Sequence, residues 1–338
     1  MVKLGINGFG RISRVVIRAA HDMEDIDIRG INIRNADLDY LVYMLKYDST
    51  FGRFPGKVER WGDKGLKIDG KEIPVFSEED AHNIPWNECG AEYIMDGTGA
   101  YNTTEKAQAH LDAGARKVII SAPAKDKGTP TFVYGVNHEG YTRDMKVVSN
   151  ASCTTNCLAP ICKIINDRWG IEGGLMSTIH SATAKQKVVD MRSNNDWRRG
   201  RSVFNNLIPT TTGAATAVGL VIPDLKGKLT GIAYRVPTAD VSLIDLNIVL
   251  KEPADYDDIC TEVKNASETY MKDVIEYIDD EVVSGDFIGD PNACIFDSRE
   301  GIQMNEHYFK LVCFYDNEWG YSVQILRMLK YMNEIDND

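Results

Sequence analysis

The sequence predicts two domains, an α/β domain with a doubly wound parallel sheet and an α+β domain with an antiparallel sheet. Short apolar strands alternate with helices over residues 1–152, which is typical of a parallel sheet. Over residues 153–318 longer strands follow one another with little helix between them, which favours an antiparallel sheet. A final helix at residues 319–338 is expected to pack back on the first domain.

The elements of the first domain follow the βα alternation in order. A parallel sheet of this kind binds its ligand at the carboxyl ends of its strands, which here lie near Gly8, Thr98 and Ser121. The expected strands are 4–7, 26–32, 91–99, 117–123 and 146–149, the expected helices are 11–23, 37–46 and 104–115, and residues 51–74 are a turn-rich antiparallel stretch.

The second domain starts with a helix that runs to residue 169 and should be kinked by Pro160. Residues 181–211 form a basic, Asn/Gly-rich stretch that is too long for an idle loop. The remaining expected elements are strands 174–179, 229–235, 241–250 and 308–316 and helices 253–275 and 319–332.

A glycine fingerprint lies between the first strand and the first helix. It has the form G-x-G-x-x-G with a serine at the third glycine, a position that needs a small residue. Because the helix N-terminus that follows suits a pyrophosphate, this placement predicts a Rossmann-type dinucleotide site. The residues are Gly8, Phe9, Gly10, Arg11, Ile12 and Ser13.

The end of the second strand bears on the choice of cofactor. An acid after Asn32 would bind the ribose 2′-hydroxyl of NAD+, but Ile33 and Arg34 stand there. Since an arginine suits a 2′-phosphate, the sequence favours NADP+ over NAD+. Two alternatives stay open: Asp37 could reach back to the ribose, and Arg34 could be a solvated surface charge.

Cys153 is the candidate nucleophile. A β-branched strand precedes it and an apolar helical period follows it, so it lies in the first turn of a helix. There the helix dipole is expected to lower the thiol pKa and to give a reactive thiolate. The alternative is a merely buried cysteine, as expected for Cys157. A Cys-x3-Cys pair without further ligands has no zinc pattern, so no metal is expected.

His180 is the candidate base because it ends the strand at residues 174–179 and titrates in the range that a thiol needs. The other histidines are expected to be structural. They are His21, His82, His110, His138 and His307.

The composition limits the partners. The net charge of −12 argues against nucleic acid and against an anionic membrane surface. No apolar run approaches the roughly 18 residues of a membrane span, and a strand at the start of the chain argues against a signal peptide. Seven cysteines without a framework spacing suggest reduced thiols, so we expect a cytoplasmic protein.

Several stretches carry a resemblance to a known family. They are residues 5–12, 45–49, 149–160, 196–197, 200–201, 209–215, 227–231, 235–238 and 315–322. Over essentially its whole length the chain resembles the phosphorylating glyceraldehyde-3-phosphate dehydrogenases, which act in glycolysis and gluconeogenesis.

The resemblance implies a reaction. Cys153 would attack D-glyceraldehyde 3-phosphate to give a thiohemiacetal, and His180 would take its hydroxyl proton as hydride leaves for the nicotinamide. Inorganic phosphate would then attack the resulting thioester and release 1,3-bisphosphoglycerate. The resemblance also implies a homotetramer in which residues 181–211 approach the neighbour's cofactor.

The resemblance also implies binding residues. Thr183 and Arg235 would hold the substrate phosphate, with Lys185 beside them, and Asn317 would fix the nicotinamide carboxamide. Residues for the incoming phosphate are Ser152, Thr154, Arg199, Thr212 and Gly213. Residues for the cofactor are Gly8, Phe9, Gly10, Arg11, Ile12, Asn32, Ile33, Arg34, Thr98, Gly99, Ser121, Arg192, Asn317 and Tyr321.

Three departures from the family pattern affect specificity. Lys185 replaces a threonine, Ile33 replaces an acid, and Met191 and Arg192 replace Gly-Pro in a loop that would come near the adenosine ribose. The last two favour NADP+.

Other activities remain open at this point. One alternative is an erythrose-4-phosphate dehydrogenase or another phosphorylated-aldehyde dehydrogenase. Thr183 argues against the erythrose-4-phosphate activity, whereas Lys185 leaves that activity open. A thiol hydrolase without nucleotide and a non-catalytic redox sensor or binding protein are the others.

Overall fold

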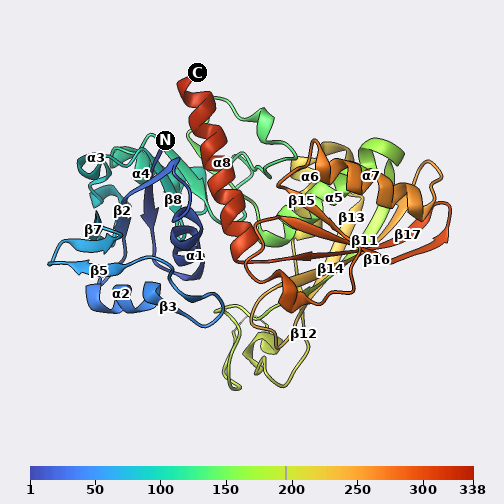
Figure 1. Cartoon of the computed structure of the whole chain (residues 1–338), viewed down its shortest axis with the longest axis horizontal. Coiled ribbons are helices and arrows are strands. Elements are labelled where there is room, and N and C mark those ends of the chain that lie inside the picture. The colour runs from blue at the N-terminus through green and yellow to red at the C-terminus, as the bar shows by residue number, and fades with distance from the viewer. Residues whose placement is uncertain (195) are drawn as a thin grey trace. The chain divides into compact units, whose positions relative to one another are not determined.

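The computed structural model describes residues 1–194 and 196–338, which form two compact units (Figure 1). Unit 1 consists of Met1–Phe132, His138–Ala151 and Ser322–Asp338, and unit 2 consists of Val133–Asn137 and Ser152–Tyr321. Within the described part of the chain, no helix combines the length and apolar character needed to cross a bilayer.

Unit 1 is built on an eight-stranded sheet. In spatial order its strands are β10 (Val147–Ser149), β9 (Lys117–Ile120), β8 (Tyr93–Asp96), β1 (Val2–Asn7), β2 (Ile26–Asn32), β7 (Lys71–Phe76), β6 (Gly65–Ile68) and β5 (Val58–Trp61). The pairings from β10 to β7 are parallel, whereas β7, β6 and β5 pair antiparallel. This confirms the predicted doubly wound sheet with its antiparallel stretch.

Two helices of unit 1, α2 and α4, begin at a residue whose side chain caps the helix. Asp37 caps α2 by accepting from the Tyr40 N–H, and Thr103 caps α4 in the same way. Asp37 is therefore engaged in its own helix. The helices are α1 (Arg11–Ala20), α2 (Leu38–Lys46), α3 (Trp86–Cys89), α4 (Thr104–Asp112) and, from Ser322 onward, α8 (Trp319–Asn337); β3 (Tyr47–Asp48) and β4 (Gly52–Arg53) form a small hairpin.

Unit 2 is built on a seven-stranded sheet. In spatial order its strands are β12 (Ile208–Thr211), β13 (Leu229–Arg235), β11 (Ile171–His180), β14 (Ser242–Leu250), β17 (Tyr308–Tyr315), β16 (Cys294–Asn305) and β15 (Ile275–Ile278). Most pairings are antiparallel, as predicted, but β11 pairs with β13 and β15 with β16 in parallel. The long connection after β11 supplies the length that a parallel pairing needs.

Three helices, α5 (Cys153–Trp169), α6 (Ala214–Val221) and α7 (Tyr256–Glu268), pack against this sheet, with α5 in contact with both others (Figure 1). Five short 3-10 helices complete the described chain: η1 (Ala81–Asn83), η2 (His138–Gly140), η3 (Trp197–Gly200), η4 (Pro223–Leu225) and η5 (Ser284–Phe287).

Several predicted boundaries were wrong. The first helix ends at Ala20 and not at residue 23, and α7 covers only the middle of the range 253–275 because the backbone leaves the helical region at Thr269. The sequence did not reveal β12, β15, β16 or α6. In β16 the second half is exposed and polar, so it lacks the buried alternation that marks a strand.

Candidate active site

Cys153 lies in the first turn of α5, as predicted. The helix starts there because the Ser152 side chain accepts a hydrogen bond from the Thr155 N–H at 3.1 Å. Just before it, Ala151 has φ 55, in the left-handed region that a residue with a β-carbon rarely adopts. This sharp turn ends the extended segment after β10 and presents Cys153 at the helix start.

His180 faces the sulfur of Cys153. The distance from Sγ to Nε2 is 3.5 Å, and both residues belong to unit 2. His180 ends β11 and is 4% exposed, with the ring of Tyr315 edge-on at 6.0 Å. The structure therefore brings together the nucleophile and the base that the sequence predicted.

The protonation of this pair differs from the prediction. Burial raises the pKa of the Cys153 thiol, although the Arg235 guanidinium acts in the opposite direction. Burial, reinforced by Arg235, lowers the pKa of His180 to about 3. The thiol pKa thus lies above its ordinary value and not below it as expected, because burial outweighs the Arg235 guanidinium and the hydrogen bonds to Thr154. The pair is thus a thiol beside a neutral imidazole.

Arg235 bears on where the imidazole carries its proton. Its Nη1 lies 2.5 Å from Nδ1 of His180 and donates to the Ser181 carbonyl at 3.1 Å. The same carbonyl lies 2.9 Å from Nδ1. A guanidinium only donates, so with Arg235 in place Nδ1 is the acceptor and the proton sits on Nε2. Without Arg235, Nδ1 can donate to Ser181 and leave the Nε2 lone pair facing the thiol.

Hydroxyl groups surround the pair. The Tyr315 hydroxyl lies 2.9 Å from both Thr154 Oγ1 and Thr178 Oγ1. Thr154 Oγ1 in turn lies 4.0 Å from Cys153 Sγ. Tyr315 on β17 and Thr178 on β11 were not predicted from the sequence, since only the packing of both strands against α5 brings them here.

Other predicted phosphate residues make contacts of their own. Thr183 donates from its N–H and its hydroxyl to Gln186 Oε1, at 2.9 and 2.7 Å. Arg199 donates to Thr210 Oγ1, and Lys185 is exposed. Thr212 accepts from the Ala214 N–H, with Gly213 between them as the cap of α6. Within residues 1–194 and 196–338, the hydrogen bonds of the Cys153 sulfur go to Thr154 and His180 and to none of these residues.

A separate pocket of about 780 Å³ lies in unit 1, at the carboxyl ends of β1, β2 and β8. Of the predicted cofactor residues it includes Gly8, Gly10, Asn32, Ile33, Arg34 and Thr98, and it also includes Tyr101, Glu78 and Glu79, which the sequence analysis missed. Phe9, Arg11, Ile12, Gly99 and Ser121 do not line it.

The pocket fits the pyrophosphate of a dinucleotide. Gly8 has φ +99, and a β-carbon there would come within 3.1 Å of Thr98 Cγ2. Gly10 caps α1 and has open space where its β-carbon would be. Gly10, the residue directly before the first turn of α1, thus lies at the pocket with no side chain in the way, which suits an anion at a helix N-terminus.

The predicted nicotinamide residues lie in unit 2. Asn317 is 4% exposed, and its Oδ1 accepts from the hydroxyls of Ser181 and Ser242 at 2.8 and 2.6 Å. Because these bonds hold the amide oxygen toward the two serines, the NH₂ group of Asn317 is left on the other side of the amide as a donor. Tyr321 is buried, and Arg192 is exposed in the loop after β11.

Comparison with known proteins places the chain in a family. The family model for the glyceraldehyde 3-phosphate dehydrogenase C-terminal domain matches residues 152–317, and the model for the NAD binding domain of the same enzymes matches residues 2–104. The chain belongs to the glyceraldehyde 3-phosphate dehydrogenase family.

Curated relatives of this family align along nearly the whole chain. Glyceraldehyde-3-phosphate dehydrogenase 2 of Schizosaccharomyces pombe is 55% identical over 329 residues, 97% of each chain. The glyceraldehyde-3-phosphate dehydrogenase of Phanerodontia chrysosporium is 54% identical over 335 residues, 99% of this chain and 98% of the relative. The glyceraldehyde-3-phosphate dehydrogenase of Cochliobolus heterostrophus is 52% identical over 338 residues, which cover 100% of this chain and 99% of the relative.

Family membership fits the two sites described above. The NAD binding model covers the pocket beside Gly8, and the C-terminal model covers Cys153, His180 and Arg235. The protein is thus an oxidoreductase that uses a nicotinamide cofactor. Its relatives confirm the family, the fold class and the enzyme class that the sequence predicted.

Proposed function

We propose that this protein catalyses the phosphorylating oxidation of D-glyceraldehyde 3-phosphate to 1,3-bisphosphoglycerate. The observation that carries the proposal is the Cys153 sulfur held 3.5 Å from the His180 imidazole at the start of α5. A nucleophile and a base at this distance form the pair that covalent catalysis on an aldehyde requires.

The first step joins the substrate to the protein. The thiol proton of Cys153 passes to Nε2 of His180 as the sulfur bonds to the aldehyde carbon. The imidazolium then returns this proton to the former carbonyl oxygen, which gives a thiohemiacetal. His180 can accept a proton only with a free Nε2 lone pair, so this step requires Arg235 to leave Nδ1. A substrate phosphate that binds Arg235 would draw it away.

The oxidation then proceeds at the same carbon. A nicotinamide, when bound, accepts the hydride from this carbon. His180 takes the hydroxyl proton while the thioester carbonyl forms. The Asn317 amide, fixed by Ser181 and Ser242, supplies the NH₂ donor that would orient the nicotinamide carboxamide.

The last step releases the product. An oxygen of inorganic phosphate bonds to the thioester carbon, the carbon–sulfur bond breaks, and the leaving sulfur recovers its proton from His180. Two phosphate groups need hydrogen-bond donors. For the phosphate of the substrate we propose Thr183, Lys185 and Arg235. For inorganic phosphate they are proposed at Ser152, Thr154, Arg199, Thr212 and Gly213.

The choice between NAD+ and NADP+ is the finer question. Ile33, Arg34 and Arg192 led the sequence analysis to NADP+, but the comparisons give that preference no support. Arg34 pairs with Glu79 at 3.1 Å, and Glu78 lines the same pocket. One guanidinium with two carboxylates is a net negative set of charges, which favours the uncharged ribose hydroxyl of NAD+ over a 2′-phosphate.

The assembly and the location stay proposals. A homotetramer is supported by exposed apolar side chains on the strands of unit 2, since large exposed apolar patches mark interfaces. They are Leu175, Ile232, Val249, Ile302 and Met304, joined in the 181–211 loop by Val188, Met191, Trp197, Phe204 and Leu207. Light scattering would test the tetramer, and cell fractionation would test the cytoplasmic location.

The reaction is tested by initial rates of nicotinamide reduction. Glyceraldehyde 3-phosphate should give turnover that requires inorganic phosphate, with NAD+ and NADP+ measured in parallel. Faster turnover of erythrose 4-phosphate without phosphate would replace the proposal by the erythrose-4-phosphate activity. No turnover of either aldehyde under either nucleotide would contradict it.

A further inference from the structure

The nucleotide pocket lacks an acid at the position where one is expected. The residue after Asn32 is Ile33, whose side chain accepts no hydrogen bond from a ribose hydroxyl. Among the described residues that line the pocket, the carboxylates are Glu78 and Glu79, both in the segment after β7. Since β7 pairs in parallel with β2, this segment leaves the sheet beside the end of β2.

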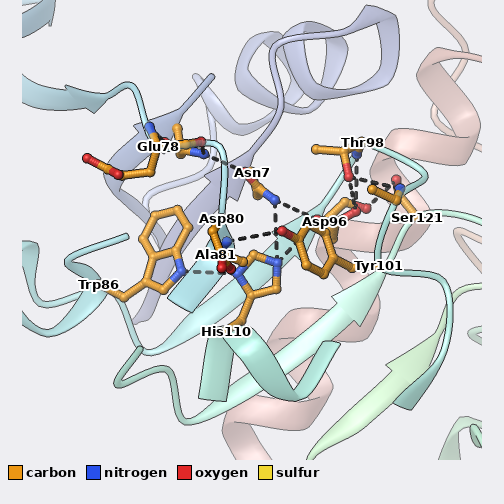
Figure 2. A network of polar contacts seen from close by, with 12 residues as sticks. Asn7, Glu78, Asp80, Ala81, Trp86, Asp96, Thr98, Tyr101, His110 and Ser121 are labelled. Atoms are coloured by element: carbon orange, nitrogen blue, oxygen red, sulfur yellow. Dashed lines mark hydrogen bonds and ion pairs between the residues drawn. The ribbon is translucent and has the colours of Figure 1, made fainter. Parts of the chain in front are cut away.

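A buried hydrogen-bond network supports this segment from below (Figure 2). Trp86 Nε1 donates to Nδ1 of His110 at 3.2 Å, so this nitrogen is unprotonated. The His110 proton therefore sits on Nε2, which lies 3.2 Å from Asp96 Oδ2. Both side chains are fully buried. Donors converge on the Asp96 carboxylate, which is thereby fixed.

The network continues from Asp96 to Glu78 through two asparagines. Asn7 donates from Nδ2 to Asp96 Oδ2 at 2.7 Å, so its Oδ1 is free to accept from Asn32 Nδ2 at 2.8 Å. Asn32 also donates to the Glu78 carbonyl at 3.0 Å and accepts from the Glu78 N–H at 2.9 Å. The backbone of Glu78 is thus clamped on both sides to the end of β2.

The side chains of the two glutamates differ in their contacts. Glu79 is paired with Arg34. The Glu78 carboxylate has no hydrogen-bond or ion-pair partner within residues 1–194 and 196–338, and its side chain extends away from Asn7 (Figure 2). Glu78 is half-buried, its backbone is fixed and it lines the pocket, so its unpaired carboxylate is suited to accept a hydrogen bond from a ligand hydroxyl.

We propose that Glu78 is the specificity-determining acid of the cofactor site, accepting hydrogen bonds from the adenosine ribose hydroxyls in place of an acid after β2. The inference rests on the proposed function and deepens it, since it makes NAD+ the preferred cofactor. A 2′-phosphate would bring a dianion toward this carboxylate and be repelled.

Calorimetric titration of the cofactor-free enzyme with NAD+ and with NADP+ tests the role of Glu78. Glu78→Gln should raise the Kd for NAD+ about tenfold, the cost of losing a charged acceptor, while the Kd for NADP+ falls or stays. The Kd for NADP+ divided by the Kd for NAD+ should then drop by at least about tenfold. Glu78→Asp keeps the charge and should retain most of the discrimination.

Glu72→Gln is the matched control, because Glu72 lies exposed on β7 outside the pocket and loses the same charge. It should leave both Kd values unchanged. Thermal melting should show that the variants are folded. Wild-type affinity for NAD+ in Glu78→Gln, or an equal shift in Glu72→Gln, would overturn the inference. Either result of the binding titration would leave the proposed reaction unaffected. Conversely, a wild-type enzyme without turnover would contradict the proposed reaction but would not affect the binding titration.

Discussion

Two buried histidines show how differently the two units use the same side chain. His110 in unit 1 is fully buried, with one ring nitrogen accepting from Trp86 and the other beside Asp96. His180 in unit 2 is almost as buried, but its Nε2 faces the sulfur of Cys153. Its Nδ1 lies between the Arg235 guanidinium and the Ser181 carbonyl.

The difference lies in what the ring nitrogens contact, not in burial. Both nitrogens of His110 have fixed partners, so the fold sets its tautomer. His180 has one contact with a nucleophile and two competing contacts at Nδ1, so its tautomer can change when Arg235 moves. We conclude that a histidine with exchangeable partners marks chemistry, whereas one with saturated partners marks architecture.

Replacing His180 should give the largest effect on rate. His180→Gln removes the base, so kcat should fall about 10²- to 10⁴-fold. Folding lowers the pKa of His180 from 6.5 to about 3, so between these pH values the imidazole binds a proton in the unfolded chain but not in the folded protein. Wild-type stability should therefore fall as pH drops from 6.5 toward about 3, and the variant should lose less. Stopped-flow rates and urea unfolding across pH measure both effects, and a near-normal kcat would remove His180 from the mechanism.

Replacing His110 should instead affect stability. His110→Phe leaves the Trp86 N–H and the Asp96 carboxylate short of partners, which should cost about 2–4 kcal/mol. The kcat at saturating substrates should change less than about threefold, since no reacting atom is involved. The exposed His82 provides the control variant His82→Phe. Urea unfolding that shows no loss of stability would contradict the architectural role.

Removing Arg235 should shift the titration of the reactive pair. The guanidinium lowers the pKa of both Cys153 and His180, so Arg235→Gln should raise both values. Alkylation of Cys153 by iodoacetamide should then require a higher pH than in the wild type, and the His180 ring should titrate at a higher pH by NMR. Alkylation at lower pH in the variant would show that Arg235 does not favour the thiolate.

The smallest effect is expected at Lys185. This residue is exposed, so solvent screens its proposed ion pair with the substrate phosphate, and Lys185→Thr should raise the KM for glyceraldehyde 3-phosphate about threefold while kcat stays unchanged. Lys127→Thr, at an exposed lysine of unit 1, is the control. An unchanged KM in Lys185→Thr would remove Lys185 from the proposed phosphate site.

Local patterns predicted the elements that carry the site, but not the environment of its groups. The end of β1 and the starts of α5 and β13 follow from strand and helix periods that lie in adjacent residues. The distance between Cys153 and His180 depends on packing α5 against β11, so the sequence indicated the pair by residue type and by the resemblance but not its geometry.

The errors concern groups whose properties arise from distant parts of the chain. The thiol pKa was predicted from the helix terminus alone, whereas burial by residues from other elements decides its direction. Glu78 gave no signal in the sequence, because its clamp to Asn32 joins segments far apart in the chain.

Trapping of the acyl intermediate tests whether Cys153 is the nucleophile. The enzyme is mixed with glyceraldehyde 3-phosphate and the nicotinamide cofactor without inorganic phosphate, quenched in acid and digested for mass spectrometry. We expect a 3-phosphoglyceryl thioester on Cys153, formed with about one equivalent of reduced cofactor per site and discharged by added phosphate. The Cys153→Ser variant should form neither. An unmodified Cys153 in turning-over enzyme, or an acyl group on another residue, would contradict the account.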